Sequence, residues 1–301
     1  MQIRKNESGP HTIGVVTVLF NSAHVLPGFF NSLAGSIDAD IDLIVVCNDQ
    51  DTESAELARR LGAENGIPTT VIQNAENVGV AEANNQGLRL CMKRGHPYIL
   101  IANNDIEFGP GVIAGTRGAL ENGFDAISPL ITYFDTPSLI WYGGGTINVL
   151  LGRTEHKGYL KKIKETDSKL QPTGYAPTCF LMIRRCILDQ VGLMDPHYFV
   201  YYDDSDFILR LRRAGFRLGY YPRYCVMHKV SSSTGGSASA FTLYYTNRNR
   251  ILFIRKNISF PLRLIPLVYL LTTKFVRFPF MPANKRSIVL KAIYDGFRIH
   301  L

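Results

Sequence analysis

The chain begins its regular pattern with an apolar, largely β-branched stretch, Thr12-Ile13-Gly14-Val15-Val16-Thr17-Val18-Leu19-Phe20. Residues 43–47 form a second run of this kind, and each run is followed by polar or small residues and then by a helix-compatible segment. Further apolar runs at 70–72 and 98–102 flank a predicted helix at 80–93. Alternation of this kind predicts strands and helices in turn. We therefore expect about the first hundred residues to form a parallel, doubly wound α/β sheet.

Polar side chains follow three of these predicted strands. Asn21 follows the first strand, Asn48 and Asp49 follow the second, and Asn103-Asn104-Asp105 follows the last. The carboxyl ends of parallel strands lie at one edge of a sheet, where ligands of such folds bind. Asn and Asp also make ordinary turns, which explains any one of these loops. Three such loops in one sheet favour a ligand site over turns alone.

Three carboxylates stand near the start of another predicted helix, in the stretch Tyr201-Tyr202-Asp203-Asp204-Ser205-Asp206-Phe207-Ile208-Leu209-Arg210-Leu211-Arg212. Carboxylates this close repel each other, which raises a pKa toward the range that a general base needs. Helix capping explains one acid at such a position, because the helix dipole favours negative charge there, but it explains three less well. Asp203, Asp204 and Asp206 are therefore candidate catalytic residues, beside a helix predicted over 206–214.

The composition is that of a globular, enzyme-sized protein of 301 residues with a formal net charge of +8. This length suits one large domain, or one domain with an appendage. Five cysteines without CxxC spacing, and no signal-peptide pattern at the start of the chain, predict reduced thiols in the cytoplasm. The positive charge suits an anionic partner, but no zinc-ligand spacing or other nucleic-acid signature occurs, so we expect no nucleic-acid partner. The turn after the first strand lacks GxGxxG, which argues against a nicotinamide dehydrogenase.

The middle of the chain, residues 128–175, has a looser pattern with many aromatic residues and the run Gly143-Gly144-Gly145. We expect an irregular excursion over the site, in which the glycines form a hinge or, slightly favoured, a tight turn. A buried strand at 179–183 and a short helix at 186–191 should follow. The Ser- and Gly-rich stretch 231–239 is expected to be a linker or a flexible lid.

Residues 240–301 concentrate the positive charge and contain no acid before Asp295. Their longest uncharged apolar run, 264–273, is interrupted by a proline and is shorter than the ~20 residues of a membrane-spanning helix. We expect either a helix that lies on an anionic membrane surface or a helix pair packed on the domain or in a dimer, with equal weight. The predicted domains are a catalytic domain at 1–235 and a basic, apolar, helical segment at 236–301.

Taken together, the motifs have an order and spacing that is specific, although each alone is weak. They are Val15-Val16-Thr17 leading to Asn21, Val45-Val46-Cys47-Asn48, Asn77-Val78-Gly79, Asn84-Asn85-Gln86-Gly87, Asn103-Asn104-Asp105, Phe180-Leu181-Met182-Ile183-Arg184-Arg185, Val191-Gly192-Leu193-Met194-Asp195, the acidic stretch at 203–212, Gly215-Phe216-Arg217-Leu218, Pro222, His228 and Arg248-Asn249-Arg250. In this order they cover most of the chain, which resembles a family 2 glycosyltransferase, the inverting group with the GT-A fold, and is most similar to its rhamnosyltransferase-like branch. The resemblance implies a Rossmann-like mixed sheet flanked by helices, with a C-terminal helical extension.

The resemblance also implies a role for the acidic residues. A nucleotide diphosphate leaves as an acceptor hydroxyl attacks the anomeric carbon, so the hydroxyl needs a base and the phosphates need a cation. Asp204 matches the family's base, with Asp203 in place of the usual glutamate and Asp206 as the alternate. Asp105 stands at the position of the family's DxD motif and, with His228 and diphosphate oxygens, is expected to hold Mg²⁺ or Mn²⁺.

Donor binding is assigned by the resemblance to polar residues after the first strands. These are Thr17 and Asn21 near the base, Asp49 near the base or ribose, Asn77 with Asn84 or Asn85 near the ribose and phosphates, and Asn103 and Asn104 beside the metal position. The chain departs from the family at Cys47, which stands where an aspartate usually precedes Asn48. A thiol cannot accept hydrogen bonds as a carboxylate does, so the base contact is expected to shift to Asp49, and the choice between uridine and thymidine stays open.

The resemblance implies assembly of a cell-surface polysaccharide on a lipid carrier at the cytoplasmic face of the plasma membrane. The expected hexosyltransferase uses dTDP-rhamnose or a UDP-sugar as donor and a lipid-linked glycan as acceptor, and it associates peripherally with the membrane. Two alternatives are a nucleotide-sugar-binding protein with weakened catalysis and a nucleotidylyltransferase. The latter normally opens with a glycine-rich, basic phosphate loop, which the first loop of this chain lacks.

Overall fold

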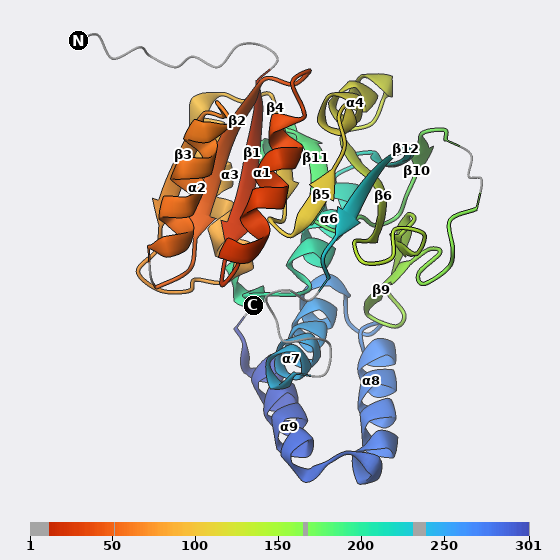
Figure 1. Cartoon of the computed structure of the whole chain (residues 1–301). Helices are drawn as coiled ribbons and strands as arrows, with labels where there is room; N and C mark the ends of the chain where they lie inside the picture. Colours follow the sequence, from red (N-terminus) through yellow and green to blue (C-terminus); the bar gives the residue numbers. More distant parts are fainter. Residues whose placement is uncertain (1–11, 51, 165–167, 231–238, 301) are drawn as a thin grey trace.

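The computed structural model describes residues 12–50, 52–164, 168–230 and 239–300. Its centre is a sheet of ten strands in the order β10-β12-β6-β11-β4-β1-β2-β3, with β5 paired to β12 and β7 paired to β6 (Figure 1). The strands of this sheet are β1 (Ile13–Leu19), β2 (Ile41–Cys47), β3 (Thr69–Gln73), β4 (Tyr98–Ala102), β5 (Ile106–Phe108), β6 (Ala126–Tyr133), β7 (Ile140–Tyr142), β10 (Gln171–Pro172), β11 (Phe180–Arg184) and β12 (Leu218–His228). The predicted strands of the first hundred residues are all present. They pair in parallel, with β1 between β2 and β4.

The sheet becomes mixed beyond β4, because β11 runs antiparallel to both β4 and β6. Helices flank it: α1 (Leu26–Ala34), α2 (Glu53–Glu64), α3 (Val80–Arg94), α4 (Val112–Ala119), α5 (Cys186–Val191) and α6 (Asp203–Arg213). Single 3-10 turns lie at Ala23–Val25, Leu120–Asn122, Pro196–Tyr198 and Phe278–Phe280. The central strands read as unbroken apolar runs because helices cover both faces of the sheet. The main core is accordingly continuous from β1 through β6 and β11 to α6.

The 128–175 region is more regular than the sequence pattern predicts. The strand β6 continues to Tyr133, β7 pairs with it, and β8 (Gly145–Asn148) and β9 (Arg153–His156) form a separate two-stranded hairpin. The glycine run makes the tight connection from β7 to β8. A Cβ on Gly145 would stand 2.9 Å from the carbonyl oxygen of Glu155, so close backbone approach explains this glycine. The expected linker or lid at 231–239 lies outside the described residues, except for Ser239.

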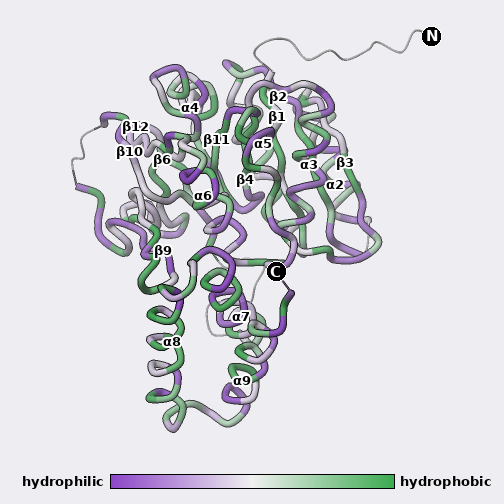
Figure 2. The backbone as a smooth tube through the Cα atoms, turned by 180° about the vertical axis from the view of Figure 1, so that it is seen from behind, coloured by the Kyte–Doolittle hydropathy of each residue, from purple (hydrophilic) through white to green (hydrophobic). Residues whose placement is uncertain are grey.

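The C-terminal region forms three helices, α7 (Ala240–Asn257), α8 (Leu264–Arg277) and α9 (Ala283–Arg298), which project from one end of the sheet domain (Figure 1). Leu252 and Phe253 of α7 are fully buried in a cluster with Tyr198 and Leu209 of the sheet domain. The helix α8 differs, because only Pro266 and Leu270 of its residues are buried. Both α8 and α9 mix hydrophobic and hydrophilic residues along their length (Figure 2). None of the described helices is long and apolar enough to cross a membrane.

Candidate active site

A pocket of about 720 Å³ opens at the carboxyl ends of the parallel strands. Its walls come from the ends of β1 and β2, the start of α3, the β4–β5 turn, the β8–β9 hairpin, the segment before α6 and the start of α7. Eight of the residues predicted from the sequence line it: Asn77, Asn84, Asn103, Asn104, Asp105, Asp203, Asp204 and His228. The other five, Thr17, Asn21, Asp49, Asn85 and Asp206, lie outside its lining.

The carboxylate of Asp204 is held by three donors. Its Oδ1 accepts from the backbone N–H of Ser205 at 2.6 Å and from the Ser205 hydroxyl at 3.0 Å. Its Oδ2 accepts from the hydroxyl of Tyr175. A carboxylate offers about four acceptor positions, so about one remains for a ligand. Asp204 is therefore fixed in orientation at the pocket wall, as a general base must be.

Asp203 has a different environment, although it is the adjacent residue. Its side chain is buried at the pocket, and burial together with the charge of Asp204 raises the pKa of Asp203 to about 7. Two neighbouring carboxylates in one low-dielectric site cannot easily both ionise. Asp203 is therefore protonated below neutral pH, whereas Asp204 accepts the hydrogen bonds from Tyr175 and Ser205.

The two predicted metal ligands meet on another wall of the pocket. Asp105 follows β4, His228 ends β12, and the Asp105 Oδ1 lies 3.2 Å from the His228 Nε2. The other ring nitrogen of His228, Nδ1, is buried and has no hydrogen-bond partner among the described residues. Within the same described ranges, no group of three or more His, Cys, Asp or Glu side chains could hold a metal ion. Asp105 and His228 thus offer two ligands at most.

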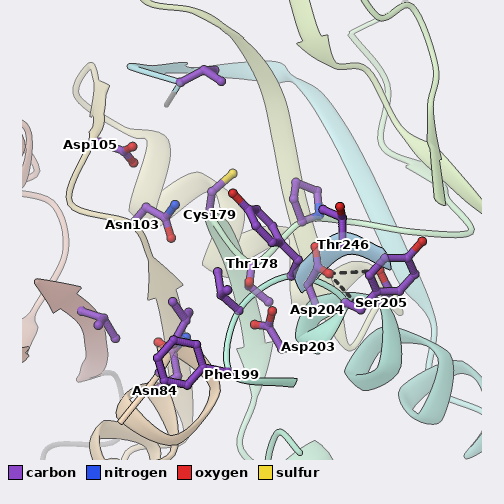
Figure 3. Close-up of a pocket in the computed structure, with 18 of the residues that line it drawn as sticks. Asn84, Asn103, Asp105, Thr178, Cys179, Phe199, Asp203, Asp204, Ser205 and Thr246 are labelled. Atoms are coloured by element: carbon purple, nitrogen blue, oxygen red, sulfur yellow. Dashed lines mark hydrogen bonds between the residues drawn. The ribbon is translucent and has the colours of Figure 1, made fainter. Parts of the chain in front are cut away.

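Buried groups that the sequence analysis did not single out lie between the Asp203–Asp204 pair and the Asp105–His228 pair. Cys179 stands between the two (Figure 3), and burial with the charges of Asp105 and Asp204 raises the pKa of its thiol. The Trp141 ring meets His228 and His156 edge to face, each at a centroid distance of 4.8 Å. These groups are buried, and burial strengthens electrostatic interactions among them.

The predicted base-binding residues Thr17, Asn21 and Asp49 do not line the pocket. Asp49 is buried, and its Oδ1 accepts from the backbone N–H of Asn21 at 2.6 Å. Its Oδ2 is buried without a hydrogen-bond partner among the described residues, as is the hydroxyl of Thr17. The neighbouring Asn48 does line the pocket and donates through Nδ2 to the carbonyl of Gly79 at 3.3 Å. Asn104 braces the first loop by donating to the carbonyl of Val18 and the hydroxyl of Ser22, both at 2.8 Å.

Two of the predicted site residues are committed to internal contacts. Asn85 exchanges hydrogen bonds with the backbone of Met194, at 2.8 and 2.9 Å. Asp206 is fully buried, and its carboxylate contacts Arg210 at 2.8 Å, Asn257 at 2.8 Å and Lys256 at 3.1 Å. These contacts join α6 to α7. The helix face that carries Asp206 thus points away from the pocket.

The segment before α6 lines the pocket with a strained backbone. Phe199, Tyr201 and Tyr202 have φ values of 62°, 63° and 67°, which non-glycine residues rarely adopt and which cluster at functional sites. Asn249 of α7 holds this segment, because its Nδ2 donates to the carbonyls of Tyr198, Val200 and Tyr201 at 2.6–2.9 Å. No local sequence signal indicates such φ values, although the aromatic run before the acids marks the place.

Other pocket residues were missed because they come from the 128–175 region. Trp141, Arg153, His156 and Tyr175 line the pocket, and no motif there has a spacing tied to chemistry. Gly79, at the start of α3, also has a role that only the tertiary structure reveals. Its φ is +83°, and an added Cβ would stand 2.7 Å from the carbonyl oxygen of Phe199.

This geometry agrees with the comparison with known proteins. The sequence model described as "Glycosyl transferase family 2" matches residues 14–192, which run from β1 to the end of α5. The chain belongs to glycosyltransferase family 2. It is 26% identical over 254 residues to the N-acetylglucosaminyl-diphospho-decaprenol L-rhamnosyltransferase of Mycobacterium tuberculosis, over 73% of this chain and 77% of that protein. The predicted resemblance to the rhamnosyltransferase-like branch is confirmed.

Solved structures of glycosyltransferases share the fold of this family 2 chain. GalNAc-T7, crystallised with UDP, GalNAc and Mn²⁺, superposes with a TM-score of 0.61 at 14% identity, over 81% of this chain but only 48% of that one. The mannosyltransferase PcManGT of Pyrobaculum calidifontis, in complex with GDP-Man and Mn²⁺, superposes with a TM-score of 0.59 at 13% identity. The superposition covers 98% of this chain and 78% of that one. The predicted GT-A fold with C-terminal helices is confirmed, and the chain is a glycosyltransferase.

Proposed function

We propose that this glycosyltransferase moves a hexose from a nucleotide-diphosphate donor to a hydroxyl of a lipid-linked glycan, with inversion and with Asp204 as the base. The observation that carries the proposal is the shared pocket. It brings an oriented carboxylate, Asp204, and a carboxylate–imidazole pair, Asp105 and His228, to the carboxyl edge of one sheet.

The acceptor step follows from the contacts of Asp204. The acceptor oxygen attacks the anomeric carbon while its proton passes to the Asp204 carboxylate, and the bond from that carbon to the β-phosphate oxygen breaks. The nucleoside diphosphate leaves with the electron pair. Because Tyr175 and Ser205 fix Asp204, the base approaches from one side of the sugar. Attack opposite the leaving group inverts the anomeric centre.

Asp105 and His228 are suited to a divalent cation. Neighbouring ligand atoms of an octahedral ion with bonds near 2.1 Å are about 3 Å apart, which agrees with the 3.2 Å between these two atoms. Asp105 and His228 would hold such an ion, which would supply positive charge for the leaving diphosphate. The Mn²⁺ present in two solved structures of the same fold supports this assignment.

The donor nucleotide is placed over the first strands in this proposal. Asn48, Asn77 and Asn84 line the pocket, and the buried Asp49 follows Asn48 in the chain. The similarity to the rhamnosyltransferase-like branch makes dTDP or UDP the expected donor nucleotide. The name of the mycobacterial relative supports rhamnose as the sugar.

The acceptor class rests on two observations. The mycobacterial relative acts, by its name, on a diphospho-decaprenol glycan. In this chain, α8 carries exposed apolar residues and the C-terminal helices hold no acid before Asp295, as expected of a surface that meets an anionic membrane. We propose peripheral association with the inner face of the plasma membrane through the 236–301 segment, with the sheet domain at 1–235 as the catalytic domain.

The proposal is tested by calorimetric titration of the protein with UDP, dTDP and GDP, each with and without Mn²⁺. Binding of UDP or dTDP that weakens without Mn²⁺ is expected. Asp105→Ala should remove the effect of Mn²⁺, whereas the control Asp135→Ala, which removes an exposed acid outside the pocket, should keep it. Failure of the folded protein to bind any of the three nucleotides would overturn the proposal. Normal binding without transfer to any acceptor would instead favour a catalytically weakened binding protein.

A further inference from the structure

Aromatic side chains from the 128–175 region form the part of the pocket wall beside Asp204. Trp141, His156 and Tyr175 line the pocket there. The His156 ring stacks on the Tyr175 ring, with centroids 5.6 Å apart and an angle of 27° between the planes. Tyr175 in turn donates its hydroxyl to the Asp204 carboxylate. The imidazole of His156 is therefore separated from the carboxylate of Asp204 by a single side chain.

One hydrogen bond sets the orientation and the tautomer of His156. Its Nδ1 lies 2.9 Å from the carbonyl oxygen of Trp141. A carbonyl oxygen can only accept, so Nδ1 carries the proton and donates it. The rings of Trp141 and Tyr142 meet the imidazole edge to face, at centroid distances of 4.8 and 5.5 Å. These contacts hold the ring in one orientation.

The second ring nitrogen of His156, Nε2, is left for a ligand. The described residues provide no hydrogen-bond partner for it. Burial lowers the pKa of His156, against the hydrogen bond to Trp141 and the charge of Asp204, which keeps the ring neutral at pH 7. In a neutral ring with its proton on Nδ1, Nε2 is an acceptor. This wall thus offers two acceptors, the remaining position of the Asp204 carboxylate and the Nε2 of His156.

The direction of attack places His156 on the acceptor side of the pocket. In an inverting transfer the acceptor hydroxyl approaches opposite the leaving diphosphate, so the acceptor sugar enters from the side of the base. That side is the wall of Asp204 and His156. A sugar hydroxyl donates one proton. Two acceptors on one wall therefore match two hydroxyl groups of the same sugar, one of which attacks.

We propose that the Nε2 of His156 binds a second hydroxyl group of the acceptor sugar, beside the one that attacks, an inference that rests on the proposed function. His156 then decides which hydroxyl reaches Asp204, because the two hydrogen bonds together fix the orientation of the sugar. An acceptor that lacks the second hydroxyl leaves Nε2 without a donor, and a site built to bind a hydroxyl discriminates against such an analogue.

The test separates acceptor binding from donor binding. Transfer is measured from dTDP-rhamnose to N-acetylglucosaminyl diphosphate on a short polyprenol, a probe that follows the name of the mycobacterial relative. His156→Phe keeps an aromatic ring against Tyr175 and removes both ring nitrogens. We expect its acceptor KM to rise about tenfold, the effect of one hydrogen bond, and its donor KM to stay within about twofold. Hydrolysis of the donor by water, which involves no acceptor sugar, should also stay within about twofold.

Rescue and control variants distinguish binding from packing. His156→Gln places an amide oxygen near the position of Nε2, so its acceptor KM should lie within about threefold of the wild type. Tyr159→Phe is the matched control, because the Tyr159 ring lies 6.3 Å from the His156 ring but does not line the pocket. Its acceptor KM should be unchanged. Thermal unfolding of each variant reports on folding.

Monodeoxy forms of the probe that keep the attacked hydroxyl identify the contact. For one of them, the wild type should lose about tenfold in acceptor KM and His156→Phe should lose nothing further. The two changes then remove the same hydrogen bond, so their effects do not add.

Four results would overturn the inference. A wild-type acceptor KM in His156→Phe would show that the imidazole only packs between the rings, and a raised donor KM would place it against the donor sugar. Additive losses with every deoxy probe would show that no hydroxyl meets Nε2. Donor hydrolysis without transfer to the probe would show that no such sugar enters the site. Nucleotide titration reports separately on the proposed function, because it needs no acceptor.

Discussion

Asp203 and Asp204 show how neighbouring residues of one type acquire different properties from their contacts. The Asp204 carboxylate accepts from Tyr175 and twice from Ser205, which fixes its direction. Asp203 is buried beside that charge and retains its proton to about neutral pH. The resemblance of the sequence to family 2 distinguishes Asp204 from Asp203, but composition and spacing alone do not. Their roles follow from the second layer of contacts, which no spacing in the chain encodes.

Removing the base should reduce the rate of transfer and leave donor binding intact. We expect Asp204→Asn to lower kcat by about 10³-fold, within the range for a general base, with the donor KM changed less than about twofold. Steady-state kinetics with a saturating acceptor measure both values. Asp203→Asn serves as the matched control and should lower kcat by less than about tenfold. A larger loss in Asp203→Asn than in Asp204→Asn would assign the base to Asp203.

The raised pKa of Asp203 predicts a dependence of stability on pH. Its pKa is about 7 in the folded chain and near the ordinary aspartate value of 3.8 when the chain is unfolded, so the folded state binds the proton more tightly. The stability that this provides is fully present below about pH 4 and is lost as the pH rises through about 7. Asp203→Asn, which resembles the neutral acid, should therefore be more stable than the wild type by up to about 4 kcal/mol at pH 8 and by only about 1.6 kcal/mol at pH 5.

Urea unfolding of the nucleotide-free protein at pH 5 and pH 8 measures this difference. The comparison between variant and wild type removes the contribution of other titrating groups, which the two proteins share. An unchanged gap between the two proteins at both pH values would contradict the shift assigned to Asp203.

Helix α6 contributes both to the pocket and to the contact with α7, because its acidic side chains point in two directions. Asp204 faces the pocket, whereas Asp206 faces α7 and meets Lys256 and Asn257 of that helix. The sequence suggested Asp206 as an alternate base. Its buried ionic contacts and its place outside the pocket lining favour a structural role instead.

Asp206→Ala should consequently affect stability more than chemistry. Removing one partner of a buried ion pair leaves charges uncompensated, and we expect a loss of about 3 kcal/mol in the free energy of unfolding. Chemical denaturation measures it, and kcat of the folded protein at low temperature should fall less than about tenfold. The control Glu82→Ala breaks an exposed pair with Arg89 and should cost less than about 1 kcal/mol. If Asp206→Ala kept its full stability but lost activity, Asp206 would be a candidate catalytic residue again.

The elements that the sequence predicts best are those whose pattern is local. The strands β1 to β4 and the helices α3 and α5 follow from apolar runs and breakers, and α5 matches its predicted range of 186–191. The β8–β9 hairpin does not, because its register depends on close approach of Gly145 to Glu155. The site divides in the same way. Motif residues such as Asp105 were found, whereas Tyr175 reaches the pocket only through tertiary packing.

The arrangement of the whole molecule places the pocket and the C-terminal helices at the same end. The parallel strands direct their carboxyl ends toward this end, and α8 projects beyond it (Figure 1). Of the two expectations for the C-terminal region, packing on the domain describes α7, whose Asn249 holds the pocket segment. For the exposed helix α8, contact with a membrane surface stays a prediction. Deleting residues 240–301 would remove both, together with the pocket residues Phe241 and Thr246, so point variants of α8 separate the two roles.

The exposed apolar side chains of α8 and the turn after it should carry membrane binding. Phe275 is 81% exposed and Phe280 is 87% exposed. Burial of an exposed phenylalanine in an apolar phase provides about 1.5–3 kcal/mol, so replacing both by glutamate should weaken binding to phosphatidylglycerol vesicles by at least about tenfold. Thermal unfolding and nucleotide titration should be unchanged, because neither residue lines the pocket.

Ile37→Glu is the matched control: Ile37 is 93% exposed but precedes β2, at the opposite edge of the sheet, and should not alter vesicle binding. Vesicle binding that survives in Phe275→Glu/Phe280→Glu would place the membrane contact on another surface, and equal loss in Ile37→Glu would show that binding is not oriented by α8.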